Sequence, residues 1–140
     1  LRAIIPQIIT QLLNDKKEIY IGNINPTRDL TYVDDTCEAF LSIAKNKKFI
    51  GNVTNIGNKN EISVKNLIRK ISEIINIKKK IVIKKNRIRP KKSEVEQLVC
   101  DNRKLIENSN WSPKVSLMQG LNHTVQWTKE NNRKNFQYTI

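Results

Sequence analysis

The segment from Thr27 to Asp35, with the sequence TRDLTYVDD, constrains the fold of this chain more than any other. An arginine and an aspartate begin a short run of β-prone residues, and the run ends in two carboxylates. Asp35 is followed three residues later by Glu38, which matches a capping box at the start of a helix. The segment therefore predicts a strand that leads into a helix N-terminus, with one cation, Arg28, at the beginning of the strand.

The other apolar patterns predict an α/β fold with few short strands and several helices. The predicted elements are a helix over 4–13, strands over 18–21, 53–57 and 80–84, a helix capped by Ser63, a short helix capped by Asp101, and a last helix that opens with a capping box at Ser116. These strands are scattered along the chain. They could add to a sheet built by other residues more easily than they could complete one.

The length of 140 residues favours one domain, which we place at residues 1–130, followed by a polar tail over 131–140. No apolar run reaches 18 residues, so no transmembrane helix is expected. The first residues lack a signal-peptide pattern and an initiator methionine. We therefore expect the chain to begin in the middle of a larger protein.

The formal net charge of +13 raises the alternative of a basic module that binds nucleic acid on its own. Against it, Lys, Asn and Ile make up about 40 % of the chain, so a high lysine content is part of a general bias. The lysine clusters at 78–80, 84–85 and 91–92 have no aromatic residues between them to stack on bases. We therefore expect no nucleic-acid partner, and no membrane partner.

Residues for metal or nucleophilic chemistry are sparse. Cys37 and Cys100 are far apart in sequence, which predicts neither a disulfide framework nor a zinc site but reduced, buried thiols in a cytosolic protein. His123 is the only histidine and has no nucleophile or acid beside it in sequence. We assign it to packing or to the surface, and we expect no metal and no catalytic residue in this chain.

Five blocks of the sequence form a recognisable series. The blocks are Arg2-Ala3-Ile4-Ile5-Pro6, the Arg28 segment, the stretch from Asn55 to Ser63, Arg87-Ile88-Arg89-Pro90 with Ser93-Glu94-Val95, and, more weakly, Gly120 to Trp127. Together they resemble the C-terminal, substrate-binding part of extended short-chain dehydrogenase/reductase enzymes, and in particular of the NAD-dependent nucleotide-sugar 4,6-dehydratases and epimerases. No single block is decisive, but their order and spacing are shared with that family.

The resemblance implies an enzyme whose N-terminal Rossmann core, with its NAD site, is not in this chain. The four glycines do not have the spacing of a dinucleotide fingerprint. The family's catalytic Tyr with a Lys four residues later is also missing, since Ile24 follows Tyr20 and Thr36 follows Tyr32 at that spacing. The fragment alone is therefore expected to be inactive, and the intact enzyme is expected to be a cytoplasmic homodimer.

For the intact enzyme, the resemblance implies a 4,6-dehydratase, a lyase acting on a UDP-N-acetylglucosamine-like substrate in lipopolysaccharide or other surface-polysaccharide synthesis. Such an enzyme oxidises the sugar at C4, eliminates water across C5–C6 and returns the hydride at C6. A 4-epimerase of the same family, which returns the hydride at C4, is the alternative, because the residues that distinguish the two lie upstream.

The resemblance also assigns the substrate-binding residues. It places Arg28 and Arg89 on the two sides of the substrate pyrophosphate, which suits the planar fork of arginine. The alternatives are an ion pair of Arg28 with Asp29 or Asp34, and a solvated basic loop around Arg89. The remaining assignments are Arg2, Ala3 and Ile4 at the nucleotide base, Val64 near the nucleotide where some dTDP-sugar dehydratases have Asn, and Glu94 at a ribose hydroxyl.

Overall fold

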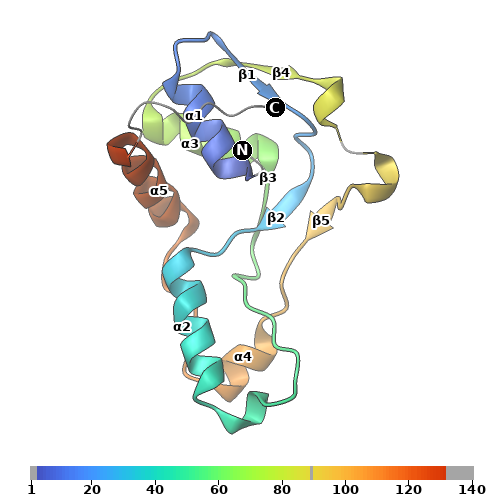
Figure 1. Cartoon of the computed structure of the whole chain (residues 1–140), viewed down its shortest axis with the longest axis vertical. Coiled ribbons are helices and arrows are strands. Elements are labelled where there is room, and N and C mark those ends of the chain that lie inside the picture. The colour runs from blue at the N-terminus through green and yellow to red at the C-terminus, as the bar shows by residue number, and fades with distance from the viewer. Residues whose placement is uncertain (1–2, 89, 132–140) are drawn as a thin grey trace. The chain divides into compact units, whose positions relative to one another are not determined.

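The computed structural model describes residues 3–88 and 90–131, which form two compact units. Of the described residues, the first unit contains 3–26, 63–88, 90–95 and 121–131, and the second contains 27–62 and 96–120. Figure 1 shows the elements of both units with their labels. Because the chain passes between the units several times, each unit is assembled from segments that are distant in sequence.

The first unit is built on the amphipathic helices α1 (Ile4–Leu13) and α3 (Val64–Ile75), which pack against each other. Ser63 caps α3 as predicted, because its Oγ accepts the backbone N–H of Asn66 at 3.2 Å. Asn76 ends the helix in the left-handed conformation at φ 59°. Of the residues expected to face inward on α3, Leu67, Ile68, Ile71 and Ile75 are buried, whereas Val64 is only half-buried.

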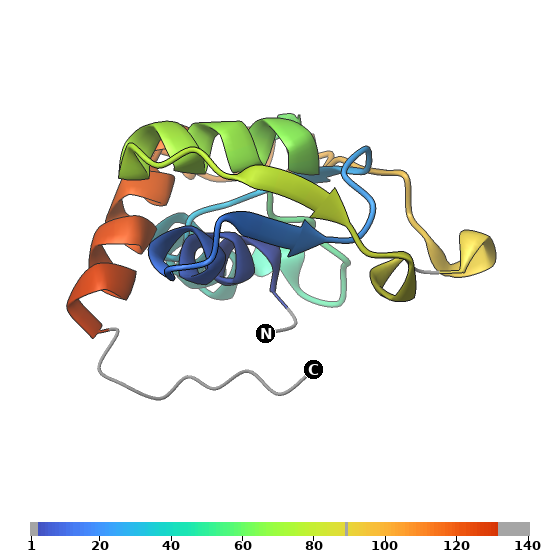
Figure 2. The same ribbon diagram turned by 90° about the horizontal axis from the view of Figure 1, so that it is seen from above.

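Two parallel strands, β1 (Glu18–Ile21) and β4 (Lys80–Ile83), form the sheet of this unit, and Figure 2 shows them running side by side. The Gln11 side chain on α1 fixes β1 by accepting the Tyr20 N–H at 2.7 Å and donating to the Tyr20 carbonyl at 3.2 Å. Ile19 and Ile21 are buried, whereas Glu18 and Tyr20 are only half-buried. This alternation is the strand pattern expected from the sequence.

The second unit has a three-stranded sheet in the order β3-β2-β5, with β2 (Thr27–Asp29) in the centre. The outer strands are β3 (Glu61–Ser63) and β5 (Gln97–Leu98), and β5 pairs in parallel with β2 so that Arg28 lies opposite Leu98. The strand predicted at the Arg28 segment is therefore confirmed, and it is the central strand of a very short sheet.

Two further helices and three one-turn elements lie among the described residues. The helix α2 (Val33–Ala44) follows β2, as predicted, and α4 (Arg103–Asn108) follows β5. The 3₁₀ turn η1 (Lys47–Phe49) belongs to this unit, and η2 (Lys85–Arg87) and η3 (Lys91–Ser93) belong to the first. Ala39, Phe49, Leu105 and Trp111 form the small core of the second unit.

The last helix, α5 (Leu117–Asn131), starts in the second unit and ends in the first. Its predicted capping box is present, because Gln119 Oε1 accepts the Ser116 N–H at 2.9 Å and Ser116 Oγ accepts the Gln119 N–H at 3.3 Å. Of the three residues expected to be buried on this helix, Leu121 and Val125 are buried and Leu117 is half-buried. His123 is exposed on this helix, and the predicted tail from residue 132 onward lies outside the described residues.

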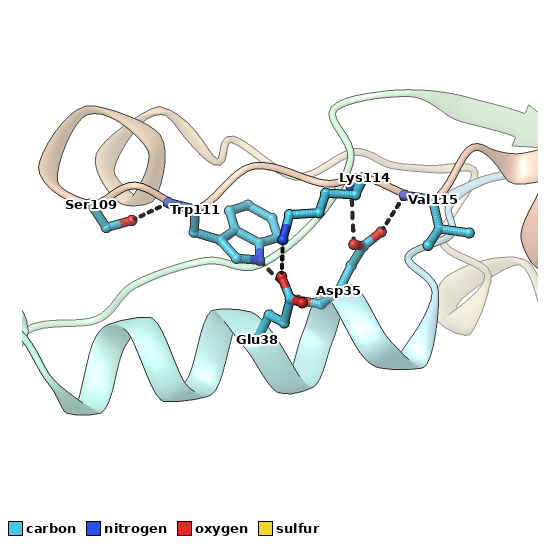
Figure 3. A network of polar contacts seen from close by, with 6 residues as sticks. All are labelled: Asp35, Glu38, Ser109, Trp111, Lys114 and Val115. Carbon is cyan, nitrogen blue, oxygen red and sulfur yellow. Dashed lines mark hydrogen bonds and ion pairs between the residues drawn. The ribbon is translucent and has the colours of Figure 1, made fainter.

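The predicted role of Asp35 as a helix cap is wrong. The helix begins at Val33 with Tyr32 as its N-cap, so Asp35 lies within the first turn, only 2 % exposed. Its two carboxylate oxygens accept the backbone N–H groups of Lys114 and Val115, each at 3.0 Å, and its carbonyl accepts Trp111 Nε1–H at 2.9 Å (Figure 3). Asp35 thus fastens α2 to the segment that leads into α5.

Two further expectations are wrong. No strand forms over residues 53–57 in the described part of the chain, and Val53 is 85 % exposed. The two cysteines are free, but Cys37 is exposed and Cys100 is half-buried. Phe40 and Leu41 on the apolar face of α2 are 63 % and 59 % exposed, so that face has no core to cover it here.

We expect the isolated chain to bind a hydrophobic dye and to unfold with low cooperativity. Phe40, Leu41, Ile50, Val53 and Leu98 are all more than half exposed in the second unit, and such a group is large for a soluble monomer. Fluorescence of 1-anilinonaphthalene-8-sulfonate measured along a urea titration checks this. A monomeric chain with a sharp transition and no dye fluorescence would contradict it.

Candidate functional site

Arg28 is the candidate anion-binding residue that the structure places most clearly. It is half-buried in β2, the central strand of the β3-β2-β5 sheet, so hydrogen-bonded strands hold its backbone on both sides. Its Nη1 donates to the carbonyl of Thr27 at 2.6 Å. The planar fork of a guanidinium is always charged and suits an anionic ligand.

Asp29, the next residue, has a role that the sequence did not reveal. Its Oδ1 accepts the backbone N–H of Asn58 at 3.0 Å, and its Oδ2 accepts those of Lys59 at 2.8 Å and Cys100 at 3.1 Å. Both carboxylate oxygens are therefore engaged by the backbone. Asp29 therefore holds the backbone of two neighbouring segments, in the loop before β3 and after β5.

Arg28 belongs to the second unit, whereas the other described residues predicted to bind substrate belong to the first. Ala3 is the exposed N-cap of α1, and Ile4 is half-buried at the first position of that helix. Val64 is half-buried at the first position of α3, and Glu94 is half-buried directly after η3. Arg2 and Arg89 lie outside the described residues.

The backbone approaches closely where β1 and β4 end, between Gly22 after β1 and Arg87 after β4. A Cβ atom on Gly22 would lie 2.3 Å from the carbonyl oxygen of Arg87, so only glycine permits this approach. Arg87 Nη1 donates to the Tyr20 carbonyl at 2.8 Å, and Lys84 Nζ lies 4.7 Å from the centre of the Tyr20 ring. The basic segment that precedes Arg89 in sequence therefore has one arginine, Arg87, bound to the sheet.

The positive charge of the chain is concentrated in the first unit. The described residues of that unit include 14 Lys and Arg against 5 Asp and Glu, whereas those of the second include 8 of each. A general bias toward lysine would raise the positive charge of both units. Because the second unit has no formal net charge, an anionic ligand would be attracted chiefly to the first.

A cleft of about 600 Å³ lies entirely within the second unit. Apolar residues of α2 and β5, Phe40, Ile43 and Leu98, line it together with the polar residues Asn55, Asp29 and Asp101. Burial and the neighbouring carboxylates of Asp29 and Asp101 raise the pKa of the Cys100 thiol, which also lines the cleft. Cys100 is therefore less reactive than an ordinary exposed thiol.

At the edge of this cleft, Arg103 should hold the carboxyl of Asp101 ionised far into acid. Hydrogen bonds from the Arg103 side chain, the shortest at 2.6 Å, lower the pKa of Asp101 to about 2. The folded pKa is below the unfolded value near 3.8, so the stabilisation is complete above that value and is lost as the pH falls toward 2. In a carboxyl NMR titration, Arg103→Leu should return this pKa toward 3.8; an unchanged pKa would contradict the assignment.

Neither the glycines nor the described acidic, His and Cys residues have the arrangement of a dinucleotide or metal site. Its four glycines lack the spacing that a pyrophosphate-binding turn requires, and they fall in a close strand contact, a surface turn, a packed loop and a helix. Over the ranges 3–88 and 90–131, no group of three or more His, Cys, Asp or Glu could hold a metal ion. In the same ranges, no helix is long and apolar enough to cross a membrane.

A family model described as GDP-mannose 4,6 dehydratase matches residues 1–124. Human dTDP-D-glucose 4,6-dehydratase is 29 % identical over 131 residues, covering 91 % of this chain and 37 % of that protein. A UDP-N-acetyl-alpha-D-glucosaminuronate decarboxylase of Bacillus cytotoxicus is 32 % identical over 130 residues, covering 91 % and 40 %. The chain belongs to the nucleotide-sugar dehydratase and epimerase family of extended short-chain dehydrogenases, and it spans about 40 % of the length of these relatives.

Solved structures agree with this assignment. The UDP-glucuronic acid 4-epimerase of Bacillus cereus, solved with UDP-glucuronic acid and NAD, superposes with a TM-score of 0.81 at 30 % identity, covering 92 % of this chain and 40 % of that one. The dTDP-glucose 4,6-dehydratase of Bacillus anthracis, solved with NAD, gives 0.80 at 26 % identity, covering 93 % and 40 %. The predicted family is confirmed, and its members include both dehydratases and epimerases that bind NAD.

Proposed function

We propose that this chain is the C-terminal, nucleotide-sugar-binding part of an NAD-dependent 4,6-dehydratase that acts on a UDP-N-acetylglucosamine-like substrate in surface-polysaccharide or lipopolysaccharide synthesis. The observation that carries the proposal is Arg28. It is a half-buried cation in the central strand of a sheet, within a chain that the family model matches from residue 1 to residue 124.

In this proposal the residues of the chain bind and orient the substrate. The pyrophosphate of a nucleotide sugar carries two negative charges, and the fork of Arg28 neutralises them with paired hydrogen bonds while Arg89 approaches from the other side. Arg2, Ala3 and Ile4 hold the nucleotide base, with Val64 near the nucleotide and Glu94 at the ribose. Holding the nucleotide at one end places the sugar ring for reaction at the other.

NAD and the catalytic Tyr and Lys are assigned to an N-terminal Rossmann part outside this chain. That part would pack against the second unit, covering the exposed residues of α2 and supplying a strand partner for residues 53–57. The 85 % exposure of Val53 and the apolar lining of the cleft support this arrangement. The intact enzyme is then proposed to be a cytoplasmic homodimer.

A 4-epimerase is the second candidate within the family. The names of relatives support both reactions, since UDP-glucuronate 4-epimerase of Thermodesulfobacterium geofontis is 30 % identical over 128 residues. Val64 lacks the amide that some dTDP-sugar dehydratases present at this position, and this favours a UDP sugar. The residues that distinguish dehydration from epimerisation belong to the part outside this chain.

The candidate from another class is a basic module that binds nucleic acid. The concentration of positive charge in the first unit is the observation that favours it. It requires an affinity for DNA that falls steeply with salt, because each neutralised phosphate releases counterions. A nucleotide-sugar site requires selective binding of UDP or dTDP compounds instead.

We expect the isolated chain to convert no nucleotide sugar. The reason is that the chain has neither a glycine fingerprint nor a Tyr followed by Lys at four residues. Incubation with NAD and UDP-N-acetylglucosamine, followed by chromatography of the remaining substrate, checks this. Substrate should be consumed only when the N-terminal part is supplied, and turnover by the pure chain would refute the proposal.

A further inference from the structure

We propose that Asp29 is a positioning residue, whose carboxylate fixes the backbone around Arg28 so that the guanidinium meets the substrate pyrophosphate. The inference rests on the proposed function, because it takes Arg28 as the phosphate ligand. It assigns to Asp29 a task that involves no contact with substrate.

The carboxylate of Asp29 joins three segments that are distant in sequence. It belongs to β2, and it accepts N–H groups from Asn58 and Lys59, in the loop that leads to β3, and from Cys100, which follows β5. The three bonds are 3.0, 2.8 and 3.1 Å long. Hydrogen bonds to an ionised acceptor are among the stronger ones in proteins.

These bonds matter because the sheet around Arg28 is so short. The strands β2 and β3 have three residues each and β5 has two, so few ladder hydrogen bonds oppose a slip in register. A slip of one residue would turn every side chain of β2 to the opposite face. At the end of β2, the Asp29 carboxylate adds hydrogen bonds to the segment before β3 on one side and to the segment after β5 on the other.

The local packing is fitted to this arrangement. A Cβ atom on Gly57 would lie 2.2 Å from the Cβ of Cys100 and 3.0 Å from Oδ2 of Asp29, so the two flanking segments approach this closely only with glycine at position 57. Asn58 Nδ2 adds a bond of 2.6 Å to the carbonyl of Leu30, directly after Asp29. The backbone on both sides of Asp29 is therefore held.

Asp29 and Arg28 point to opposite faces of the strand, since side chains alternate along β2. The carboxylate can therefore fix the backbone of Arg28 without entering the face from which Arg28 projects. The expected functional effect of removing the carboxylate is a displaced or mobile Arg28, rather than the loss of a ligand contact.

A double-mutant cycle in the full-length protein tests this inference. Asp29→Asn places an amide N–H₂ against backbone N–H donors, and it should weaken UDP-N-acetylglucosamine binding roughly tenfold, the effect of about one lost charge-assisted bond. If Asp29 acts through Arg28, the double variant Asp29→Asn/Arg28→Ala should bind no more weakly than Arg28→Ala alone. Independent losses that multiply would overturn the inference.

The matched control is Glu107→Gln, which removes one exposed carboxylate from α4 in the same unit and should leave binding unchanged. NAD affinity should also be the same in all variants. If Glu107→Gln weakened binding as much as Asp29→Asn, the effect would be one of net charge and the inference would fail.

Amide hydrogen exchange separates this inference from the proposed function, because it needs no ligand. In Asp29→Asn, the amides of Asn58, Lys59 and Cys100 should exchange at least tenfold faster than in the parent protein. Unchanged exchange overturns the inference whatever the protein binds. Faster exchange in a protein that binds no nucleotide sugar supports the backbone role and refutes the proposed function and, with it, the role of Asp29 in substrate binding.

Discussion

Replacing Arg28 with alanine should weaken the binding of UDP-N-acetylglucosamine to the full-length protein by about 2–4 kcal/mol, the usual effect of truncating one partner of a buried charge pair. Arg28 is half-buried in the central strand of its sheet, so its backbone is well placed to hold the guanidinium in position. Isothermal titration of the nucleotide sugar measures the change. Arg28→Lys should recover only part of the loss, because an ammonium cannot form the paired hydrogen bonds of the fork.

NAD affinity provides the internal control for this variant. It should barely change, since the cofactor's phosphates are assigned to the glycine-rich turn of the other part. A structural ion pair of Arg28 with Asp29 or Asp34 predicts the reverse pattern, in which thermal stability falls and nucleotide-sugar affinity is retained. Intact affinity for UDP-N-acetylglucosamine would exclude the pyrophosphate role of Arg28.

Asp35→Ala should lower the free energy of unfolding by about 3–5 kcal/mol, because it leaves two partly buried backbone N–H groups without their acceptor. Asp35 is only 2 % exposed, and it binds the N–H groups of Lys114 and Val115 (Figure 3). Such a loss is a large part of the stability of a typical domain. Urea unfolding of the full-length protein, followed by Trp fluorescence, measures it.

Asp34→Asn is the matched control for this prediction. Asp34 is the adjacent residue on α2 and is exposed, so its substitution should change the free energy of unfolding by less than about 0.5 kcal/mol, as at most surface positions. Asp35→Asn should have an intermediate effect, because the amide retains one acceptor oxygen. Equal stabilities of Asp35→Ala and Asp34→Asn would show that the buried network contributes little.

The elements with strong local signals were predictable from the sequence. The helix α3 combines a Ser63 cap with apolar residues at helical spacing, and both features are present in the structure. Similarly, α1, β1 and β4 lie where the apolar pattern placed them. In these segments the residues that favour the local structure are also the ones that the first unit buries, so local and tertiary preferences agree.

The elements that depend on distant partners were not predictable. Residues 53–57 have the composition of a strand, but a strand needs a hydrogen-bonding neighbour, and the described part of the chain supplies none. Asp29 and Asp35 are ordinary acidic residues in sequence, and their roles depend on backbone N–H groups at least 29 residues away. No spacing rule reveals such a contact, although a glycine such as Gly57 marks where two backbones approach closely.

The measurement that tests the central proposal most directly is a competition experiment on the full-length protein carrying a fluorescent UDP sugar. The complex is challenged with UDP, or with duplex DNA at the same phosphate concentration. The proposed nucleotide-sugar site predicts that UDP displaces the probe and that DNA leaves it bound at physiological salt. Displacement of the probe by DNA, with UDP ineffective, would contradict the proposal.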